Sequence, residues 1–578
     1  METKHNRELP LIYLFFLLLS IVSVYWVWIQ GPTYFSGDDL AFHLSRIEGV
    51  AESIVGGEFL PRINYFFAGG MGYPTGIFYP ELFLYPAGIL RVLGLSIVSS
   101  YQVYLVLLNF STFVVSYHCF KSVQHTSRGA VLFSVLYGVS SYRMSDVLYR
   151  GAVGESIAFL LLPLVYVGIY QVIYGNKDKW WLLTLGMTGL IYSHPLSAFM
   201  VVLFLSVYFL VSLRSVLKEK SRLLRLFLAA GVAFLLSVDI LLPMVEQLLF
   251  QRLRVQDVSL FYLSKEAQSM GWYLAQGLKN SGFNNLGLLI PFGLLLGLIG
   301  LKGQTNENKR LLGIGALFLL FSTSHFPHVL FNQTFFNTIQ FPWRYFLIVT
   351  FLVSWVVAEN LTKTTRLSTK RKQVIGLVLI GLTLGFNIQN QLQLKRVEWR
   401  THSAATWNTI DRETSLGYGK EFLPSGMNGW MAPTSLLTQP QEVTLTSMSR
   451  NGNSFYLKYQ TPTEARLIYP LLYYKGYAVE VNGERKTAED AGMFDGTDMH
   501  GFLQVTVKGS GSVLVWYEGT MIQKISRLVT VSSWILFIGY YVLRRTGKGL
   551  RAKEALEKWM KQKKMTREGV NIKSKVNE

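Results

Sequence analysis

Two adjacent carboxylates, Asp38 and Asp39, follow the first long apolar run and precede a stretch, 40–54, that has the pattern of an amphipathic helix. A spacing of i, i+4 and i+7 places Asp39, His43 and Arg46 on one face of this helix. A carboxylate near the hydrocarbon boundary is partly desolvated, which raises its pKa and suits it to take a proton from an acceptor hydroxyl. Asp38 and Asp39, together with His43, are therefore the candidate catalytic residues.

Two other interpretations of this segment stay open. Ser36 or Asp38 could cap the helix, a role that is compatible with a catalytic Asp39. A carboxylate and a histidine on one face could also hold a divalent metal ion, Mg²⁺ or Mn²⁺, but Asp39 and His43 are too few ligands to assign a cofactor. The single cysteine, Cys119, lies inside an apolar run and in no metal-ligand spacing.

Arginines near the ends of the apolar runs are candidates for binding an anionic leaving group. A guanidinium forms bidentate hydrogen bonds with phosphate and keeps its charge where water is scarce. The candidates are Arg150, Arg344, Arg46 and Arg143. Alternatively, such arginines form ion pairs with Asp146 or Glu155, or extend to lipid headgroups.

The composition places these residues in a membrane protein. Of the 578 residues, half are hydrophobic and only 16% are charged, below the roughly 25% of average globular proteins. Apolar runs near the length that spans a bilayer recur between short polar links. These features exclude a soluble enzyme, a disulfide scaffold and a disordered chain. The sequence contains no P-loop, nucleophile elbow or zinc-protease helix, which argues for a lipid-borne substrate over a soluble nucleotide.

Twelve apolar runs are expected to cross the membrane, with both termini in the cytoplasm. The first, Leu11–Trp28, lacks a cleavage site and is expected to be a signal anchor. The others are Tyr101–Phe120, Ala130–Ser141, Ile157–Tyr174, Trp181–Tyr192, Leu196–Val211, Leu226–Leu249, Leu286–Leu301, Leu311–Ser322, Tyr345–Val357, Val374–Phe386 and Leu528–Leu543.

The distribution of charge supports this count. If Phe83–Leu95 does not cross, the basic clusters at 177–179, 214–225, 302–310 and 363–372 all lie in the cytoplasm, as the positive-inside rule requires. The tail, 544–578, has twelve basic and four acidic residues, so it carries +8 of the net charge of +20 of the whole chain. We attribute this positive charge to the membrane topology and to contact with anionic lipids, and not to nucleic-acid binding.

Polar residues that membrane helices normally avoid gather on the outer side of this topology. Asp146, Glu155 and His194, with Tyr79 and Trp343, are expected to line a cavity at the outer interface. Solvation at the ends of the spans is the alternative interpretation for any single residue.

The chain is expected to divide into four parts. Residues 1–390 form a transmembrane core with a first extracytoplasmic loop at 31–80, and 391–527 form an extracytoplasmic, mostly β domain. The last helix, 528–543, and the cytoplasmic tail, 544–578, follow. Alternating apolar residues predict strands at 442–446, 454–460, 465–474, 477–481, 503–508 and 512–517, with a hairpin turn at Asn482-Gly483, which indicates a β-sandwich.

Several short motifs carry a resemblance to known families. They are Gly37-Asp38-Asp39-Leu40-Ala41-Phe42-His43, Gly72-Tyr73-Pro74, Phe78-Tyr79-Pro80, Arg150-Gly151-Ala152-Val153-Gly154-Glu155, Ser193-His194-Pro195 and Gln340-Phe341-Pro342-Trp343-Arg344. This set resembles the bacterial membrane proteins labelled "6-pyruvoyl-tetrahydropterin synthase-related". With Leu471-Leu472-Tyr473-Tyr474-Lys475-Gly476-Tyr477, the chain is also similar to YfhO-like membrane proteins. Both groups belong with the GT-C integral-membrane glycosyltransferases.

The resemblance implies an inverting sugar transfer at the outer face of a bacterial cytoplasmic membrane. The donor would be a sugar on a polyprenyl phosphate, the acceptor an envelope polymer or lipid, and Asp38 or Asp39 the base or a metal ligand. Two alternatives stay open: a transporter or flippase of lipid-linked glycans, and a non-catalytic envelope assembly protein. The absence of an internal repeat and the position of the polar residues at span ends favour the enzyme.

Overall fold

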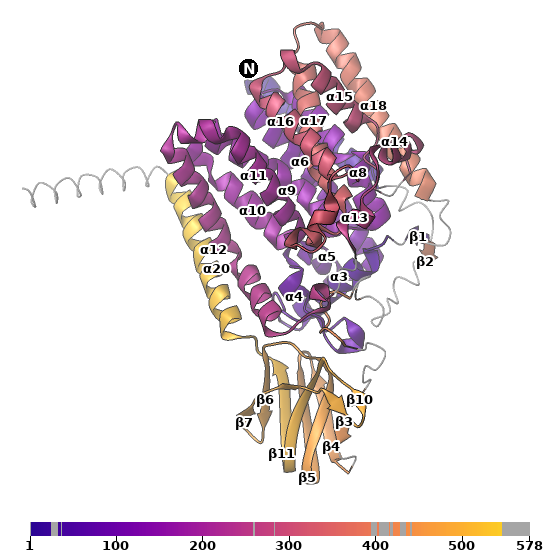
Figure 1. Cartoon of the computed structure of the whole chain (residues 1–578), viewed down its shortest axis with the longest axis vertical. Helices are drawn as coiled ribbons and strands as arrows, with labels where there is room; N and C mark the ends of the chain where they lie inside the picture. Colours follow the sequence, from indigo (N-terminus) through magenta and orange to yellow (C-terminus); the bar gives the residue numbers. More distant parts are fainter. Residues whose placement is uncertain are drawn as a thin grey trace, which may run out of the picture.

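The computed structural model describes residues 2–24, 33–35, 37–257, 261–281, 284–394, 401–403, 416, 420–427, 435–439 and 442–545. Ser36 and residues 546–578 of the basic tail lie outside the described residues. A large helical region carries an antiparallel sheet at one end (Figure 1). The start of the chain lies at the opposite end of the helical region from the sheet.

Each of the twelve predicted spans overlaps a helix, and residues 25–28 of the first span lie outside the described residues. These helices are α1 (Glu2–Val22), α6 (Ile97–Gln124), α7 (Ser127–Gly138), α9 (Val153–Ile173), α10 (Trp181–Ser193), α11 (Pro195–Leu217), α12 (Lys220–Phe250), α15 (Leu289–Ile299), α16 (Asn306–Phe321), α17 (Phe346–Lys363), α18 (Thr369–Leu394) and α20 (Met521–Arg545). Among the described residues, seven helices are long and apolar enough to cross a membrane: α6, α9, α11, α12, α17 with the turn before it, α18 and α20. The number of twelve crossings stays a prediction.

The segment Phe83–Leu95 forms only a short helix. α5 (Tyr85–Val92) has eight residues and rises about 12 Å, whereas the hydrocarbon core is about 30 Å thick. It packs against α6 and against α3 (Leu40–Val55), the amphipathic helix expected after Asp39. The remaining short helices are α4 (Thr75–Phe78), α8 (Ser141–Met144), α13 (Leu263–Glu266) and α14 (Met270–Lys279).

Polar contacts join helix ends at the pole of the bundle that lies away from the sheet. Glu307, at the start of α16, accepts hydrogen bonds from Tyr166 of α9 (2.9 Å) and Tyr208 of α11 (2.6 Å). Gln124, the last residue of α6, donates to Glu359 of α17 (2.8 Å). α12 begins at this pole and reaches the sheet with its other end (Figure 1). The basic loops that follow α6, α9, α11, α15 and α17 therefore gather at one pole, as the topology requires.

A long strand pair forms the centre of the sheet. Its strands are β3 (Leu437–Gln439), β4 (Thr444–Asn451), β5 (Ser454–Leu472), β6 (Tyr477–Val481), β7 (Glu484–Lys486), β8 (Glu489–Asp490) and β11 (Phe502–Tyr517). β5 and β11 pair along most of their length, so each merges two predicted strands. At the β6–β7 turn, Asn482 and Gly483 both have positive φ (54° and 83°), as a two-residue I′ hairpin turn needs. The pairing joins these strands in one connected sheet, and the sandwich arrangement stays a prediction.

Two short strand pairs complete the described β-structure. β9 (Met493–Phe494) pairs with β10 (Thr497–Asp498) beside the sheet. β1 (Thr33–Phe35) pairs with β2 (Thr401–Ser403), so the start of the first loop meets the chain that follows α18.

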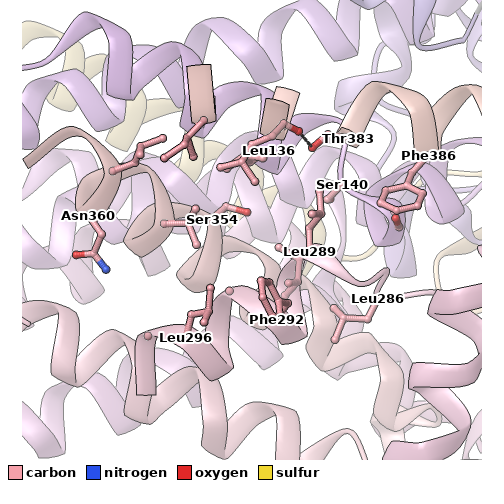
Figure 2. A pocket seen from close by; sticks show the side chains of 18 of the residues that line it. Leu136, Ser140, Leu286, Leu289, Phe292, Leu296, Ser354, Asn360, Thr383 and Phe386 are labelled. Carbon is pink, nitrogen blue, oxygen red and sulfur yellow. Dashed lines mark hydrogen bonds between the residues drawn. The ribbon is translucent and has the colours of Figure 1, made fainter. Parts of the chain in front are cut away.

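An apolar cavity of about 490 Å³ lies between α7, α15, α17 and α18 (Figure 2). Leu136, Leu289, Phe292 and Leu296 are among its lining residues. Phe292 and Leu296 are 59% and 52% exposed, which shows that the cavity opens on the outer surface of the helical region. One wall of the cavity, α18, is among the described helices that are long and apolar enough to cross a membrane.

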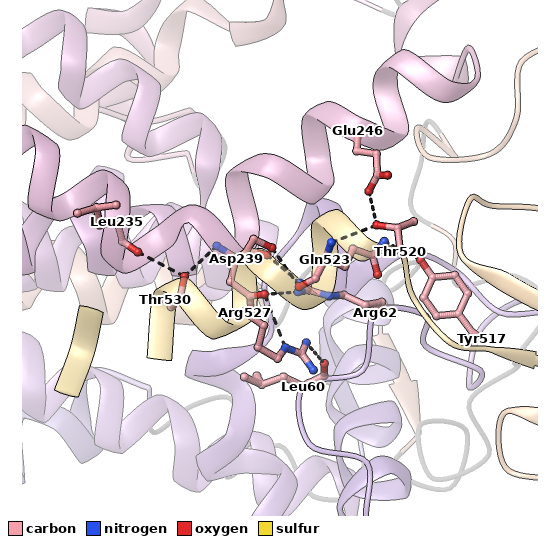
Figure 3. A network of polar contacts seen from close by, with 11 residues as sticks. Leu60, Arg62, Leu235, Asp239, Glu246, Tyr517, Thr520, Gln523, Arg527 and Thr530 are labelled. Atoms are coloured by element: carbon pink, nitrogen blue, oxygen red, sulfur yellow. Dashed lines mark hydrogen bonds and ion pairs between the residues drawn. The ribbon is translucent and has the colours of Figure 1, made fainter. Parts of the chain in front are cut away.

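The backbone hydrogen-bond ladder of α12 is interrupted where α20 and the first loop pack against the helix (Figure 3). Pro243 has no N–H, so the carbonyl of Asp239 lacks its helical partner and instead accepts from Arg62 Nη1 (2.9 Å). One turn away, the Thr530 hydroxyl of α20 accepts from the Asp239 N–H (3.0 Å) and donates to the Leu235 carbonyl (3.4 Å). The Asp239 carboxylate pairs with Arg62 and lies 3.6 Å from Arg527 Nε.

The same helix fixes the sheet. The side chain of Gln247 donates to the Lys475 carbonyl (2.6 Å) and accepts from the Lys475 N–H (3.1 Å), as a second strand would. Glu246 accepts from Thr520 (2.5 Å) at the start of α20. The sheet is therefore tied to α12 by directional hydrogen bonds to its backbone.

Candidate active site

The turn that carries Asp39 packs directly on the backbone of Arg150. The Asp39 N–H donates to the Arg150 carbonyl (2.8 Å). A Cβ at Gly37 would lie 2.6 Å from the carbonyl carbon and oxygen of Arg150, so only glycine allows this approach. Gly151 has a φ of +65° and faces Leu40. Two motifs that lie more than 100 residues apart in the sequence thus meet through glycines.

Asp39 presents its carboxylate at the edge of a charged cluster. It occupies the N-cap position of α3, but its side chain makes no capping hydrogen bond. Of the two residues considered as caps, Asp38 directly precedes the N-cap position and Ser36 lies outside the described residues. The Asp39 side chain is 43% exposed, and its Oδ2 lies 3.8 Å from Arg150 Nη2. Displacement of water by the surrounding protein raises the pKa of Asp39, while Arg150 and Arg344 oppose this rise.

Arg150 stands at the centre of three carboxylates. Its Nη1 lies 2.5 Å from Asp146 Oδ1 and 2.8 Å from Glu155 Oε2, in addition to the longer contact with Asp39. The guanidinium also stacks over the ring of Trp343 at 4.4 Å. The ion pairs that the sequence allowed for this arginine are therefore present. Because these carboxylates already balance its positive charge, Arg150 holds the side chains of the site in place more than it attracts a further anion.

Arg344 differs from Arg150 in its partners. Its Nη1 donates to the Ile339 carbonyl (2.8 Å) and to Gln340 Oε1 (3.1 Å), and the guanidinium lies over Phe341 (4.9 Å) and Trp343 (5.7 Å). Its Nε is buried without a hydrogen-bond partner. Within the described part of the chain, no carboxylate lies within ion-pair distance of Arg344. The positive charge of Arg344 is therefore less compensated by carboxylates than that of Arg150.

A strained turn holds Arg344 in place. Gln340 has φ +63° and ψ −51°, and the Phe341 N–H donates to the Ile339 carbonyl across it (2.6 Å). This is a γ-turn of the rare, strained form. The carbonyl of the turn is the same one that accepts from Arg344, so the turn and the guanidinium fix each other.

Arg46 and His43 form a second, buried layer behind the cluster. Arg46 Nη2 donates to the carbonyls of Tyr79 and Pro80 (2.8 Å each), and its Nη1 donates to His43 Nδ1 (3.1 Å). Burial and the neighbouring Arg46 lower the pKa of His43 well below its ordinary value, so His43 is neutral. Arg46 thus shapes the chain at 79–80 and is not available for a phosphate.

Tyr79 connects this layer to the charged cluster. Its ring lies 4.1 Å from the Arg46 guanidinium and 5.5 Å from the ring of His194, which hydrogen bonds Ser197 through Nδ1 (2.7 Å). A Cβ at Gly154 would lie 2.2 Å from the Tyr79 hydroxyl, so this hydroxyl sits against the first turn of α9, which carries Glu155.

The remaining phosphate-binding candidate is not part of the site. Arg143 is fully buried and donates to the Gly138 carbonyl (2.7 Å) and to Thr112 Oγ1 (3.1 Å), with the ring of Phe159 at 5.9 Å. Its expected role is therefore corrected: it ties α8 to α6 and α7 inside the protein. The reason is that its guanidinium is directed to the Gly138 carbonyl of α7 and to the Thr112 hydroxyl of α6.

The residues present do not fit a metal ion at Asp39 and His43. His43 Nδ1 is occupied by Arg46, whose positive charge repels a cation. Asp146 and Glu155 are engaged by Arg150. In the ranges that the structure describes, no group of three histidine, cysteine, aspartate or glutamate residues is placed to hold a metal.

Sequence reasoning missed two residues of this site. Tyr142 donates to Glu155 Oε1 and contacts the ring of Trp343, but no pattern in the sequence links it to either residue. Gln340 stands within a motif already singled out for its resemblance, and that motif was the signal that could have found it.

These helices, and a charged site at the pole opposite their basic loops, define a multi-pass membrane protein. Comparison with family models identifies the family within this class. The family described as "Bacterial membrane protein YfhO" matches residues 52–405, and the chain belongs to this family. No curated protein matched the chain. The match supports the YfhO-like resemblance and gives no support to the pterin-synthase wording. It begins after Asp39, His43 and Arg46 and ends before β3.

Proposed function

We propose that this protein is a GT-C-type glycosyltransferase that moves a sugar from a polyprenyl-phosphate donor to a cell-envelope acceptor at the outer face of the membrane. The observation that carries the proposal is the carboxylate of Asp39. It is partly exposed, is not used as a helix cap, and lies beside an arginine pair that stacks on Trp343. A partly exposed base beside arginine side chains is what sugar transfer from a phosphate requires.

The residues divide the reaction between them. Asp39 takes the proton of the acceptor hydroxyl while the acceptor oxygen forms the new bond to the anomeric carbon. The bond from that carbon to the phosphate oxygen breaks with its electron pair, which leaves polyprenyl phosphate. Arg344 stabilises the charge that develops on the leaving phosphate. Attack from the face opposite the leaving group inverts the anomeric centre.

The lateral cavity supports a lipid-borne donor. Its lining residues Ser140 and Ser141 directly precede Tyr142, which hydrogen bonds Glu155 of the charged cluster. The cavity is apolar along α15 and α18 and opens where a membrane would lie (Figure 2). A prenyl chain in this cavity would have its phosphate end close to the cluster.

The distribution of basic residues supports the proposal that the site lies at the outer face of the membrane. α3, which begins after Asp39, lies at the end of the helical region near the sheet, and the basic loops lie at the other pole (Figure 1). With the basic loops in the cytoplasm, the site and the sheet face outward.

Turnover of the donor tests the proposal. Purified protein in lipid nanodiscs is incubated with a panel of radiolabelled polyprenyl-phosphate sugars, and release of the sugar is followed for the wild type and for Arg344→Gln. We expect the wild type to consume at least one donor and Arg344→Gln to lower the kcat for that donor. Protection of a bound donor without any turnover would instead support the transporter or the assembly protein.

A further inference from the structure

A second apolar groove lies at the pole that carries the basic loops. It has a volume of about 300 Å³ and runs between α11 and α16. Val207 and Val211 line it from α11, and Ile314 and Leu317 line it from α16. Gly313 lies between these walls, and a Cβ there would meet nothing within 4 Å. The space above Gly313 is thus unfilled, and because its walls are apolar the groove favours a hydrocarbon chain over water.

Basic residues stand at one end of this groove. Lys309 and Arg310 line it there, in the first turn of α16. On α11, Arg214 follows Val211 by three residues and so continues the same stripe toward the same pole. Arg310 is paired with Glu307 (2.9 Å). Among the residues that the structure describes, Lys309 and Arg214 have no carboxylate within ion-pair distance.

We propose that this groove binds one anionic phospholipid, with an acyl chain between α11 and α16 and the phosphate at Lys309 and Arg214. From Lys309 to Leu317, α16 rises about 12 Å, so a phosphate held at Lys309 places the first part of the chain beside Gly313. Three cations against the single carboxylate of Glu307 leave a net positive charge, which selects an anionic over a zwitterionic headgroup. This site is separate from the cluster around Asp39 and does not depend on the proposed sugar transfer.

Competitive lipid retention tests this site. The full-length protein in detergent is mixed with equal amounts of phosphatidylglycerol and phosphatidylcholine of the same chain length, and bound lipid is counted by native mass spectrometry. We expect one phosphatidylglycerol to be retained about tenfold more than phosphatidylcholine. Gly313→Leu fills the groove without changing charge, and Lys309→Gln with Arg214→Gln removes charge without filling it. Each should lower the retention of phosphatidylglycerol to that of phosphatidylcholine.

A matched control separates the groove from the general charge of this pole. Lys302→Gln with Arg366→Gln removes two exposed basic residues that do not line the groove, and it should keep the wild-type selectivity. The open space beside Gly313 accommodates leucine, and an unchanged unfolding temperature checks each variant. Equal retention of the two lipids by the wild type would overturn the proposal. Unchanged selectivity in both groove variants, or equal loss in the control, would also overturn it.

Discussion

Asp39 and Arg150 are joined twice, once through the backbone and once through their side chains. The Asp39 N–H donates to the Arg150 carbonyl at 2.8 Å, and the carboxylate Oδ2 lies 3.8 Å from the guanidinium. The backbone hydrogen bond fixes the position of the Asp39 main chain. The longer side-chain contact leaves the carboxylate accessible to a substrate. This combination of a fixed backbone and an accessible carboxylate is what a general base requires.

Gly37→Ala should impair activity more than stability. The added Cβ would meet the Arg150 backbone at 2.6 Å, so the turn that carries Asp39 must move. A displacement near 1 Å can lower the rate by about 100-fold. The measurement is the rate of sugar transfer beside the unfolding temperature. Gly231→Ala is the control, because a Cβ there meets nothing within 4 Å; a normal rate for Gly37→Ala would contradict the role of this turn.

The pH profile should report the raised pKa of Asp39. The base acts when it is deprotonated, so kcat/KM falls as the pH drops through this pKa, above the usual value of about 3.9 for aspartate. Arg344→Gln removes a cation that lowers the pKa, so the acidic limb should move to higher pH. Asp38→Asn removes an anion that raises it, so the limb should move to lower pH. Shifts in the same direction for both variants would refute this electrostatic account.

Arg150→Gln should destabilise the protein more than Arg344→Gln does. Loss of Arg150 leaves Asp146 and Glu155 buried without their countercharge, which costs about 3–5 kcal/mol of the free energy of unfolding. In the described part of the chain, Arg344 has no carboxylate partner to leave behind. Thermal unfolding in detergent measures both effects. Equal unfolding temperatures for the two variants would show that the Arg150 cluster is not structural.

Thr530→Val should weaken the joint between α12 and α20. Valine keeps the shape of threonine but leaves the Asp239 N–H and the Leu235 carbonyl without the bridging hydroxyl. The Asp239 N–H and the Leu235 carbonyl are i, i−4 partners within α12 and can bond each other once the hydroxyl is gone, so we expect the net loss of about 0.5–1.5 kcal/mol that is typical of one hydrogen bond. Chemical unfolding in detergent measures the loss, with Ser532→Ala as an exposed control on the same helix. An unchanged free energy for Thr530→Val would argue against the bridge.

Much of the helical region could be predicted, because runs of apolar residues and basic loops carry strong local signals. The hairpin at Asn482-Gly483 was equally clear, since the turn needs two residues with positive φ. The merging of strands into β5 and β11 was not visible. The register shift near Gly509, with its φ of +75°, lets one strand continue where turn-like residues suggested an end.

The sequence indicated most of the residues that form the site, but not which residues each of them contacts. Helical spacing brought Asp39, His43 and Arg46 to one element, and shared motifs pointed to Arg150 and Arg344. No sequence rule distinguishes an arginine that carbonyl and hydroxyl oxygens hold, such as Arg143, from one that carboxylates hold, such as Arg150. That distinction depends on the tertiary packing of α8 against α6 and α7.

The most direct test of the central claim compares Asp39→Asn with Asp38→Asn in the transfer of a sugar from a polyprenyl-phosphate donor. Asparagine keeps the size of the side chain and removes its basicity, and loss of a general base lowers a rate by about 10²–10⁴-fold. We predict a loss in this range for Asp39→Asn with the donor KM nearly unchanged, and only a small change for Asp38→Asn. A wild-type rate in Asp39→Asn would contradict the assignment of this carboxylate as the base.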